Sequence, residues 1–157
     1  MYILTVMSST SDRLHPTQCT CLNLRKATRV ITQIFDETLR PSGLRATQFS
    51  CLAVIAAAQS IPINDLAQRL VMDRTTLTRN LKPLGKQGLI EIRPGEDRRI
   101  RLVRLTAKGQ EALAQALPFW EKAQTEAIDK LGLGPWHNLL ERLTQVVDLI
   151  PRSDPTI

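Results

Sequence analysis

The stretch that decides the fold spans residues 72–109 and reads MDRTTLTRNLKPLGKQGLIEIRPGEDRRIRLVRLTAKG. Asp73 is a typical helix N-cap and Gly88 a typical stop, so the first half predicts a helix that reaches Gln87. Pro83 inside this helix lacks the N–H that would bond one turn back, and its ring crowds that carbonyl. We therefore expect a bend or an early loosening of the helix at this proline.

A shorter helix is expected just upstream, with Asn64 as its N-cap and residues 65–71 as its body. The brief break between the two helices predicts a helix-turn-helix. Downstream, residues 89–93 and 101–105 are expected to be strands, because apolar residues alternate imperfectly with charged ones on both sides of a Pro-Gly turn. A hairpin after a helix-turn-helix is typical of a winged helix.

Long helices are expected on both sides of this region. Apolar residues recur at three- and four-residue spacing between Leu24 and Leu39, which predicts an amphipathic helix. Thr47 is expected to cap the helix that follows and that ends near Gln59. Its apolar stretch indicates burial on most sides.

Thr106 is expected to cap a further long helix that reaches about Leu131, and Pro135 to be the first residue of a last helix that ends near Ile150. These terminal helices exceed what a small winged-helix core needs, so their apolar faces are expected to pack against a second copy of the chain. The fold class is thus mainly α, with a winged helix-turn-helix core and long N- and C-terminal helices that form a dimerisation region. We expect a flexible arm (residues 1–18), a dimerisation region in two parts (19–45 and 106–150), a winged helix-turn-helix between those parts (46–105) and a tail (151–157).

The positive charge of the chain is concentrated in this central stretch. The whole sequence has 21 Lys and Arg against 15 Asp and Glu, a formal net charge of +6. Between Arg69 and Lys108 there are eleven basic and four acidic residues, whereas the other 117 residues hold ten basic and eleven acidic ones. The surplus indicates a polyanion-binding surface in that segment, and the alternative is a merely solvated charged face.

The order of these parts resembles the MarR family of bacterial transcriptional regulators. The resemblance is carried by residues 72–84 followed by Gly-Leu-Ile at 88–90, and by Asp-Arg-Arg at 97–99 followed by Leu-Thr-Ala-Lys-Gly at 105–109. It covers about residues 20–150. It implies a dimeric repressor whose paired recognition helices enter successive major grooves of a pseudo-palindromic duplex.

On the recognition helix, the first two turns are the part that normally reaches base edges. Arg79 can bind guanine O6 and N7 with two parallel hydrogen bonds, and Thr75 and Thr76 offer a hydroxyl and a methyl group that suit thymine. Thr78 and Lys82 are expected to hold phosphates, and the leucines at helical spacing (Leu77, Leu81, Leu84) to be core. The expected DNA-binding set on this helix is Arg74, Thr75, Thr76, Thr78, Arg79 and Lys82.

In the wing, Asp97 lies two residues before Arg99 and is expected to orient its guanidinium by a salt bridge across the tight hairpin. The family resemblance places such an arginine at the minor groove, where a narrow groove attracts positive side chains. Arg98 and Arg99 are expected to affect affinity broadly. The alternative is a hairpin that is merely rich in solvated arginine.

Two cysteines, Cys19 and Cys21, lie where the first helix is expected to begin, with His15 four residues upstream. Three interpretations stay open: a thiophilic metal site, an oxidant sensor in which the helix dipole and Arg25 acidify a thiol, or unreactive cysteines. The third cysteine, Cys51, is expected to be a small core residue.

The spacing of Cys21, Leu24, Ala27 and Arg29 is similar to that of the organic-hydroperoxide sensors of the same family, whose reactive cysteine occupies this position. On an ungapped match, however, the tyrosines that hold the sensing thiol fall at Phe35 and Ala46, whose side chains donate no hydrogen bond.

The resemblance also implies an aromatic or phenolic effector in a cleft between the dimerisation helices and the winged helix. His15, His137 and Trp120 are candidates to line it, although a core or surface role suits each of them.

Other classes of protein are disfavoured. With two histidines, no glycine-rich phosphate loop and no Ser, His and Asp at recognisable spacing, an enzyme is not expected, nor is a cofactor. The longest purely apolar run, residues 51–58, is too short to span a bilayer, and three cysteines without an export signal favour the cytoplasm. The closest alternative is an architectural DNA binder that ignores sequence.

Overall fold

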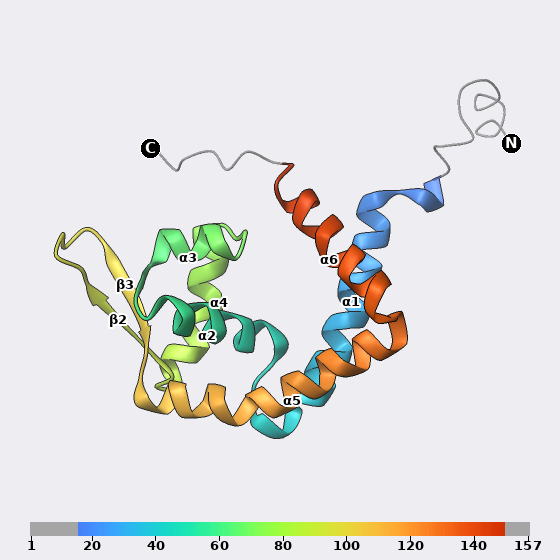
Figure 1. The fold of residues 1–157 in the computed structure, drawn as a ribbon. Helices are drawn as coiled ribbons and strands as arrows, with labels where there is room; N and C mark the ends of the chain where they lie inside the picture. Colours follow the sequence, from blue (N-terminus) through green and yellow to red (C-terminus); the bar gives the residue numbers. More distant parts are fainter. Residues whose placement is uncertain (1–15, 150–157) are drawn as a thin grey trace, which may run out of the picture.

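The structure is a computed structural model that describes residues 16–149. This part of the chain is mainly α-helical, with one small antiparallel sheet, as expected (Figure 1). The helices are α1 (Thr20–Leu39), α2 (Ala46–Ala58), α3 (Ile63–Arg69), α4 (Arg74–Lys86), α5 (Ala107–Leu131) and α6 (Leu133–Val147). The strands are β1 (Ile61–Pro62), β2 (Ile90–Pro94) and β3 (Arg101–Leu105), and short 3-10 turns occupy Pro16–Gln18 and Arg40–Ser42.

The sheet has the strand order β1-β3-β2, and both pairings are antiparallel. The β2–β3 hairpin is the wing and projects from the helices at one end of the molecule (Figure 1). Its register places Glu91 opposite Arg104 and Ile92 opposite Val103. The same Val103 pairs with Ile61 of β1, so β1 ties the chain before the helix-turn-helix to the wing.

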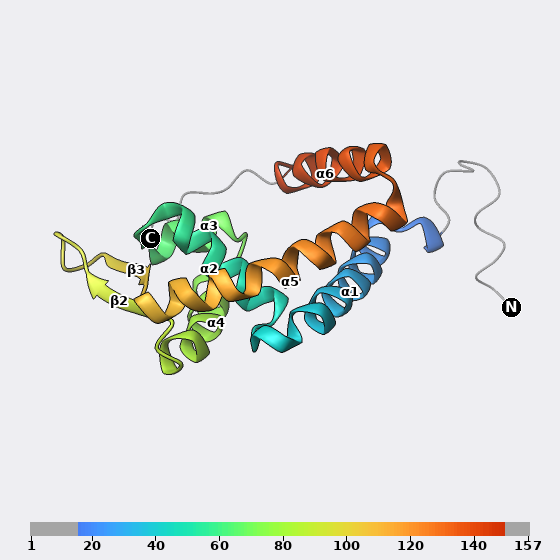
Figure 2. The same cartoon turned by 60° about the horizontal axis from the view of Figure 1, so that its bottom comes forward.

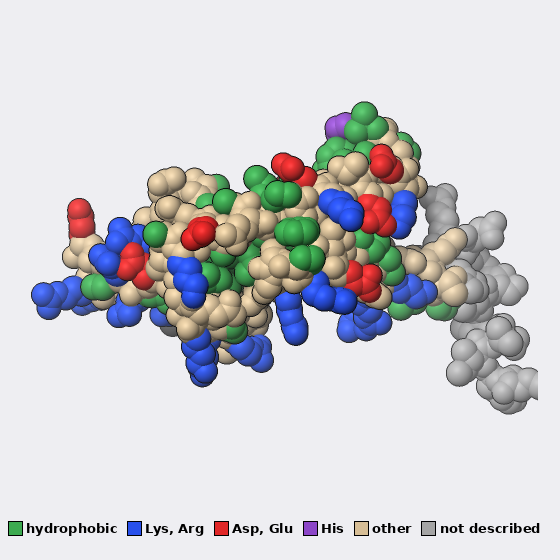
Figure 3. Space-filling view, turned by 90° about the horizontal axis from the view of Figure 1, so that it is seen from below, with side chains coloured by type: hydrophobic (Ala, Val, Ile, Leu, Met, Phe, Trp, Pro, Cys, Tyr) green, Lys and Arg blue, Asp and Glu red, His purple; other side chains and the backbone are tan. Residues whose placement is uncertain are grey.

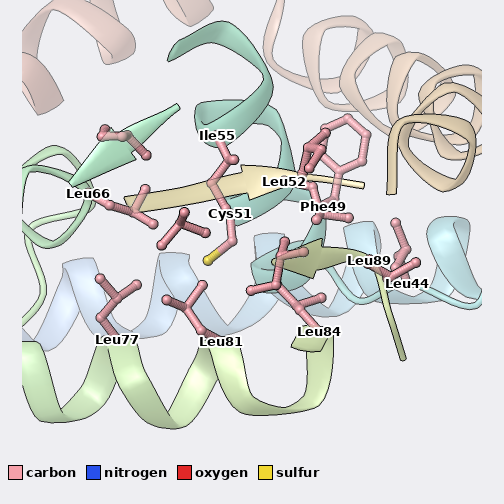
Figure 4. Packing of buried hydrophobic residues seen from close by; sticks show 14 of the residues in the cluster. Leu44, Phe49, Cys51, Leu52, Ile55, Leu66, Leu77, Leu81, Leu84 and Leu89 are labelled. Carbon is pink, nitrogen blue, oxygen red and sulfur yellow. The ribbon is translucent and has the colours of Figure 1, made fainter. Parts of the chain in front are cut away.

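The core of the winged helix lies between α2 and α4 (Figure 4). Leu77, Leu81 and Leu84 of α4 point toward α2, where the sulfur of Cys51 faces them, and all four side chains are buried. Both expectations for these residues are therefore confirmed. Burial raises the pKa of the Cys51 thiol, because a thiolate would lose its solvation there. Helix α4 continues through Pro83 to Lys86.

The start of α2 differs from the sequence prediction. The N-cap is Arg45 rather than Thr47. The free N–H groups of this helix end find partners elsewhere: Ala46 donates to the Asp36 carboxylate of α1 at 2.7 Å, and Arg45 donates to Oε1 of Gln48 at 3.0 Å. Because a carboxylate from another helix satisfies this end, a local Thr cap is not needed.

Two other helix starts are also earlier than expected. Helix α3 begins at Ile63 with Pro62 as its N-cap, not Asn64, because the chain passes from the β1 pairing directly into the helix. Helix α6 begins at Leu133, so Pro135 is its third residue and not its first. A proline is tolerated there because the first-turn N–H groups have no partner within the helix. Helix α6 ends at Val147 rather than near residue 150.

The long helices α1, α5 and α6 extend away from the winged helix (Figures 1 and 2). Helix α1 runs beside α5, and α6 folds back over the far end of α5 (Figure 2). No residue of α6 is buried in the described part of the chain. No helix of residues 16–149 is long and apolar enough to cross a membrane. The expected tail and residues 1–15 of the expected arm lie outside the described residues.

The first turn of α5 is fixed to the end of the recognition helix α4. Thr106 caps α5 as expected, accepting from the N–H of Gly109 at 3.0 Å, and its hydroxyl donates to the carbonyl of Gly88 at 2.6 Å. Lys108 donates to the carbonyl of Gln87 at 2.8 Å. A Cβ on Gly109 would overlap the carbonyl of Leu89, so the two backbones meet where only glycine fits.

Candidate nucleic-acid interface

The N-terminus of α4 is held by the cap that the sequence predicts. Asp73 accepts the backbone N–H of Thr76 at 2.9 Å through one carboxylate oxygen and the hydroxyl of Thr76 at 2.6 Å through the other. These two hydrogen bonds, the one from the Thr76 hydroxyl foremost, lower the pKa of Asp73. The first turn of the recognition helix is thereby fixed before any ligand binds.

The exposed face of α4 carries most of the side chains expected to bind DNA. Five of the six expected residues line one shallow groove along the helix, namely Arg74, Thr75, Thr78, Arg79 and Lys82. The sixth, Thr76, is half-buried and gives its hydroxyl proton to the cap. The Thr78 hydroxyl donates to the carbonyl of Arg74 at 2.8 Å, so its oxygen is anchored over this face.

The wing turn is organised by the backbone. Asp97 accepts the backbone N–H of Arg99 at 2.9 Å, and Gly95 donates to the carbonyl of Ile100 at 2.8 Å. The expected salt bridge from Asp97 to the Arg99 guanidinium is wrong: the carboxylate is used to close the tight turn, which leaves the Arg99 side chain exposed. Arg98 is exposed as well.

A carboxylate on the wing that the sequence reasoning did not single out pairs with two arginines. Glu91 of β2 accepts Nε of Arg93 at 2.9 Å and also binds Nε of Arg104, which lies directly opposite on β3. The hydrogen bond from Arg104, followed by that from Arg93, lowers the pKa of Glu91. A prediction of the register between the two strands would have placed Glu91 opposite Arg104 and so indicated this ion pair.

Lysine and arginine side chains project from the wing end of the molecule and along one neighbouring edge (Figure 3). Acidic side chains on this end are few in that view (Figure 3). The charge surplus of the central segment is thus displayed on the surface that carries the recognition helix and the wing. Such a surface suits a polyanion.

The two N-terminal cysteines lie at the start of α1. Cys19 is its N-cap, Cys21 is in its first turn, and both are exposed. Among residues 16–149 no group of three or more His, Cys, Asp or Glu side chains is placed to hold a metal ion. His15, the third member of the metal interpretation, lies outside the described residues. Phe35 and Ala46, at the tyrosine positions of the hydroperoxide sensors, pack against the core.

An apolar cavity of about 460 Å³ lies between α2 and α5. Phe49 and Ala53 of α2 contribute to one wall and Leu113 and Leu117 of α5 to the other, and Gln110 of α5 also lines it. The ring of Phe49 stacks on Trp120 with centroids 5.7 Å apart.

Two of the side chains expected near an effector cleft have other surroundings. Trp120 packs against the hydrophobic core, and His137 is exposed with its ring 4.7 Å from that of Trp136. Neither of them lines the cavity between α2 and α5. His15 lies outside the described residues.

Comparison with known proteins agrees with this geometry. A profile of the MarR family matches residues 42–100. A crystal structure of the transcriptional regulator MosR of M. tuberculosis, in complex with DNA, is 39% identical, covers 83% of this chain and 94% of that chain, and superposes with a TM-score of 0.76. The transcriptional repressor MprA of Escherichia coli K12 is 32% identical over 122 residues, 71% of this chain and 69% of MprA.

Other curated relatives are matched over a smaller share of their length. The chain spans 64% of the length of YwoH, an uncharacterised HTH-type transcriptional regulator of Bacillus subtilis, with 30% identity over 87 residues, 55% of this chain. The fold, the basic face and these relatives define a DNA-binding transcriptional regulator of the winged-helix class. The chain belongs to the MarR family.

Proposed function

We propose that this chain is a sequence-specific repressor that binds a pseudo-palindromic duplex as a homodimer and has no enzymatic activity. The observation that carries the proposal is the groove on α4, where Arg74, Thr75, Thr78, Arg79 and Lys82 face solvent together from a pre-capped helix. The repressor outcome follows the similarity to MprA.

Each element has a separate role in binding. Arg79 reads guanine in the major groove through two parallel hydrogen bonds, and Thr75 contacts thymine or a neighbouring base edge. Lys82 holds a phosphate, and the Thr78 hydroxyl holds another by turning its proton from the Arg74 carbonyl to a phosphate oxygen. Such contacts position the helix without reading sequence. Arg98 and Arg99 of the wing enter the adjacent minor groove, where the negative potential is strongest if the groove is narrow.

The far end of the molecule supports a dimer. Ten of the fourteen large apolar side chains exposed in the described protomer lie on α1, at the end of α5, or on α6 and just after it: Leu22, Val30, Ile31, Leu131, Leu133, Leu139, Leu140, Val146, Val147 and Leu149. An apolar surface of this extent marks an interaction site. A second copy that covers it would present two recognition helices to half-sites about one helical turn, roughly 34 Å, apart.

The test compares Arg79→Ala with Arg98→Ala. Sites are first selected from random duplex, and dissociation constants are then measured for a selected site and for a randomised one. Arg79→Ala is expected to weaken the selected site about tenfold or more and to leave the randomised duplex nearly unchanged, because a bidentate base contact contributes about 1–3 kcal/mol of discrimination. Arg98→Ala is expected to weaken both duplexes alike.

Two outcomes would contradict the proposal. Equal loss on both duplexes for Arg79→Ala removes its role as a base reader, and a wild-type chain with no preference would be an architectural DNA binder. A weak salt dependence also counts against it, since a dimer that neutralises about 6 to 10 phosphates loses roughly a thousandfold or more in affinity between 50 and 200 mM salt.

Release from DNA is proposed to follow a chemical signal. The apolar cavity between α2 and α5 supports a small aromatic effector, and its volume of about 460 Å³ is that of a small-molecule pocket. The exposed pair Cys19 and Cys21 supports an oxidant as the second candidate signal. If the thiols sense, peroxide weakens DNA binding of the wild type and not of Cys21→Ser. If peroxide leaves DNA binding of the wild type unchanged, the cavity remains as the input, and a loss of binding that persists in Cys21→Ser points to Cys19.

A further inference from the structure

A crevice of about 280 Å³ lies where the wing meets the helix-turn-helix, outside the groove on α4. It is lined by the start of α3, which contributes Asn64 and Asp65, by Arg74 from the first residue of α4, and by Arg99 and Arg101 from the wing. Arg74 therefore belongs to two surfaces, the groove along α4 and this crevice. We call the crevice the helix–wing crevice.

The arginines of this region divide into two groups. Within residues 16–149, Arg93 and Arg104 form ion pairs with Glu91, whereas none of the crevice arginines is found in an ion pair. Three guanidinium groups line the helix–wing crevice with one carboxylate, that of Asp65, so its formal charge is about +2. Like charges that converge in this way are unfavourable unless an anion joins them.

We propose that the helix–wing crevice binds one DNA backbone phosphate, which Arg74, Arg99 and Arg101 hold from two sides. The guanidinium fork matches phosphate oxygens, because it can donate two parallel hydrogen bonds to them. This inference rests on the proposed DNA-binding function and refines it. Arg101 becomes a DNA contact, and Arg74 binds backbone and reads no base. Arg99 binds the phosphate at the edge of the minor groove, which leaves Arg98 as the wing arginine that enters the groove.

The position of the crevice explains why the anion is a backbone phosphate. If α4 enters the major groove and the wing tip the adjacent minor groove, the strand that separates the two grooves passes between these elements. The crevice lies at that passage, with Arg74 on the α4 side and Arg99 and Arg101 on the wing side. A phosphate held there fixes the register of both elements on the duplex at once.

The first experiment measures how the affinity of the full-length chain for a selected duplex depends on salt. Arg101→Gln is expected to reduce the slope of log K against log salt by about 0.9 for each protomer bound, because one phosphate contact is lost. Arg104→Gln is the matched control: it removes the same charge from the same strand, but from an arginine that is bound to Glu91 and does not line the crevice. It is expected to leave the slope unchanged.

The second experiment locates the phosphate. Single phosphates of the duplex are replaced in turn by uncharged methylphosphonate, and binding of the wild type, Arg74→Gln, Arg99→Gln and Arg101→Gln is compared. One replacement is expected to weaken binding of the wild type about tenfold or more. The same replacement is expected to weaken binding of each of the three variants little further, because each has already lost that contact.

Three different positions for the three variants would overturn the shared site, as would equal slope changes for Arg101→Gln and Arg104→Gln. Either result leaves the proposed function standing so long as Arg79→Ala still loses its preference for the selected site. If the wild type shows no preference for any duplex, it is the proposed function that fails.

Discussion

Val71 forms the turn between α3 and α4, and its backbone is in the left-handed region, with φ of 52°. A β-branched residue there is strained by about 1–2 kcal/mol, because its Cβ crowds the carbonyl oxygen. The turn is kept by backbone hydrogen bonds on both sides, from Val71 to the carbonyl of Gln68 at 3.1 Å and from Met72 to that of Ala67 at 2.9 Å. The side chain itself is 64% exposed.

We therefore expect Val71→Gly to raise the free energy of unfolding by up to about 1 kcal/mol, since relief of the strain exceeds the extra entropy of glycine in the unfolded chain. Urea denaturation measures this change. Val71→Ala keeps a Cβ in the same conformation and is expected to change stability little. Equal stabilisation by both substitutions would mean that the exposed valine side chain, and not the backbone, is responsible.

At the scale of elements, the contact between α5 and the turn that joins α4 to β2 depends on glycine. Gly109→Ala is expected to destabilise the fold by about 1–3 kcal/mol in urea, because its methyl group overlaps the carbonyl of Leu89 and the backbones must separate. This outcome opposes helix propensity, which favours alanine.

Gly85→Ala is the control for that substitution. Gly85 also lies inside a helix, but a Cβ on it would meet no atom within 4 Å apart from its own chain neighbours and the backbone of its helix. It is expected to stabilise the chain by about 0.5–1 kcal/mol through propensity alone. If both variants change the free energy of unfolding in the same direction, the backbones at Gly109 separate without a measurable loss of stability, which would contradict this prediction.

A helix start is predictable from the sequence when the groups that satisfy its N–H donors lie nearby in the chain. The caps at Asp73 and Thr106 are satisfied by residues three positions on, so the sequence predicts them correctly. The start of α2 is satisfied by Asp36, ten residues away on another helix, and sequence pattern does not reveal that contact.

The same distinction holds for the candidate site. Five of the DNA-binding residues expected from the Asp73 cap and the family motif line one face of α4. The division of the wing arginines into paired and unpaired groups depends on the register that sets Glu91 opposite Arg104. The helix–wing crevice depends on the tertiary packing of α3 against the wing. The spacing of residues along the sequence does not predict that packing.

At the scale of the whole molecule, the apolar surface of α1 and α6 bears on oligomeric state. Leu140→Glu on α6 is expected to raise the dimer dissociation constant at least tenfold, because one leucine removed from water contributes about 1.5–3 kcal/mol. Sedimentation velocity across micromolar concentrations measures the shift. Gln145→Glu adds the same charge at an exposed polar position of that helix and is expected to leave the dimer intact. A wild-type chain that sediments as a monomer would refute the dimer.

The first two turns of α5 touch two parts of the molecule at once. Gln110 and Leu113 line the apolar cavity, and Thr106 and Lys108, less than two turns earlier, bind the backbone that ends α4. If an effector occupies the cavity as proposed, a push on this helix end displaces α4 through hydrogen bonds already in place. In the proposed dimer, that displacement would change the angle at which the two α4 helices meet the duplex, and no separate relay would be needed.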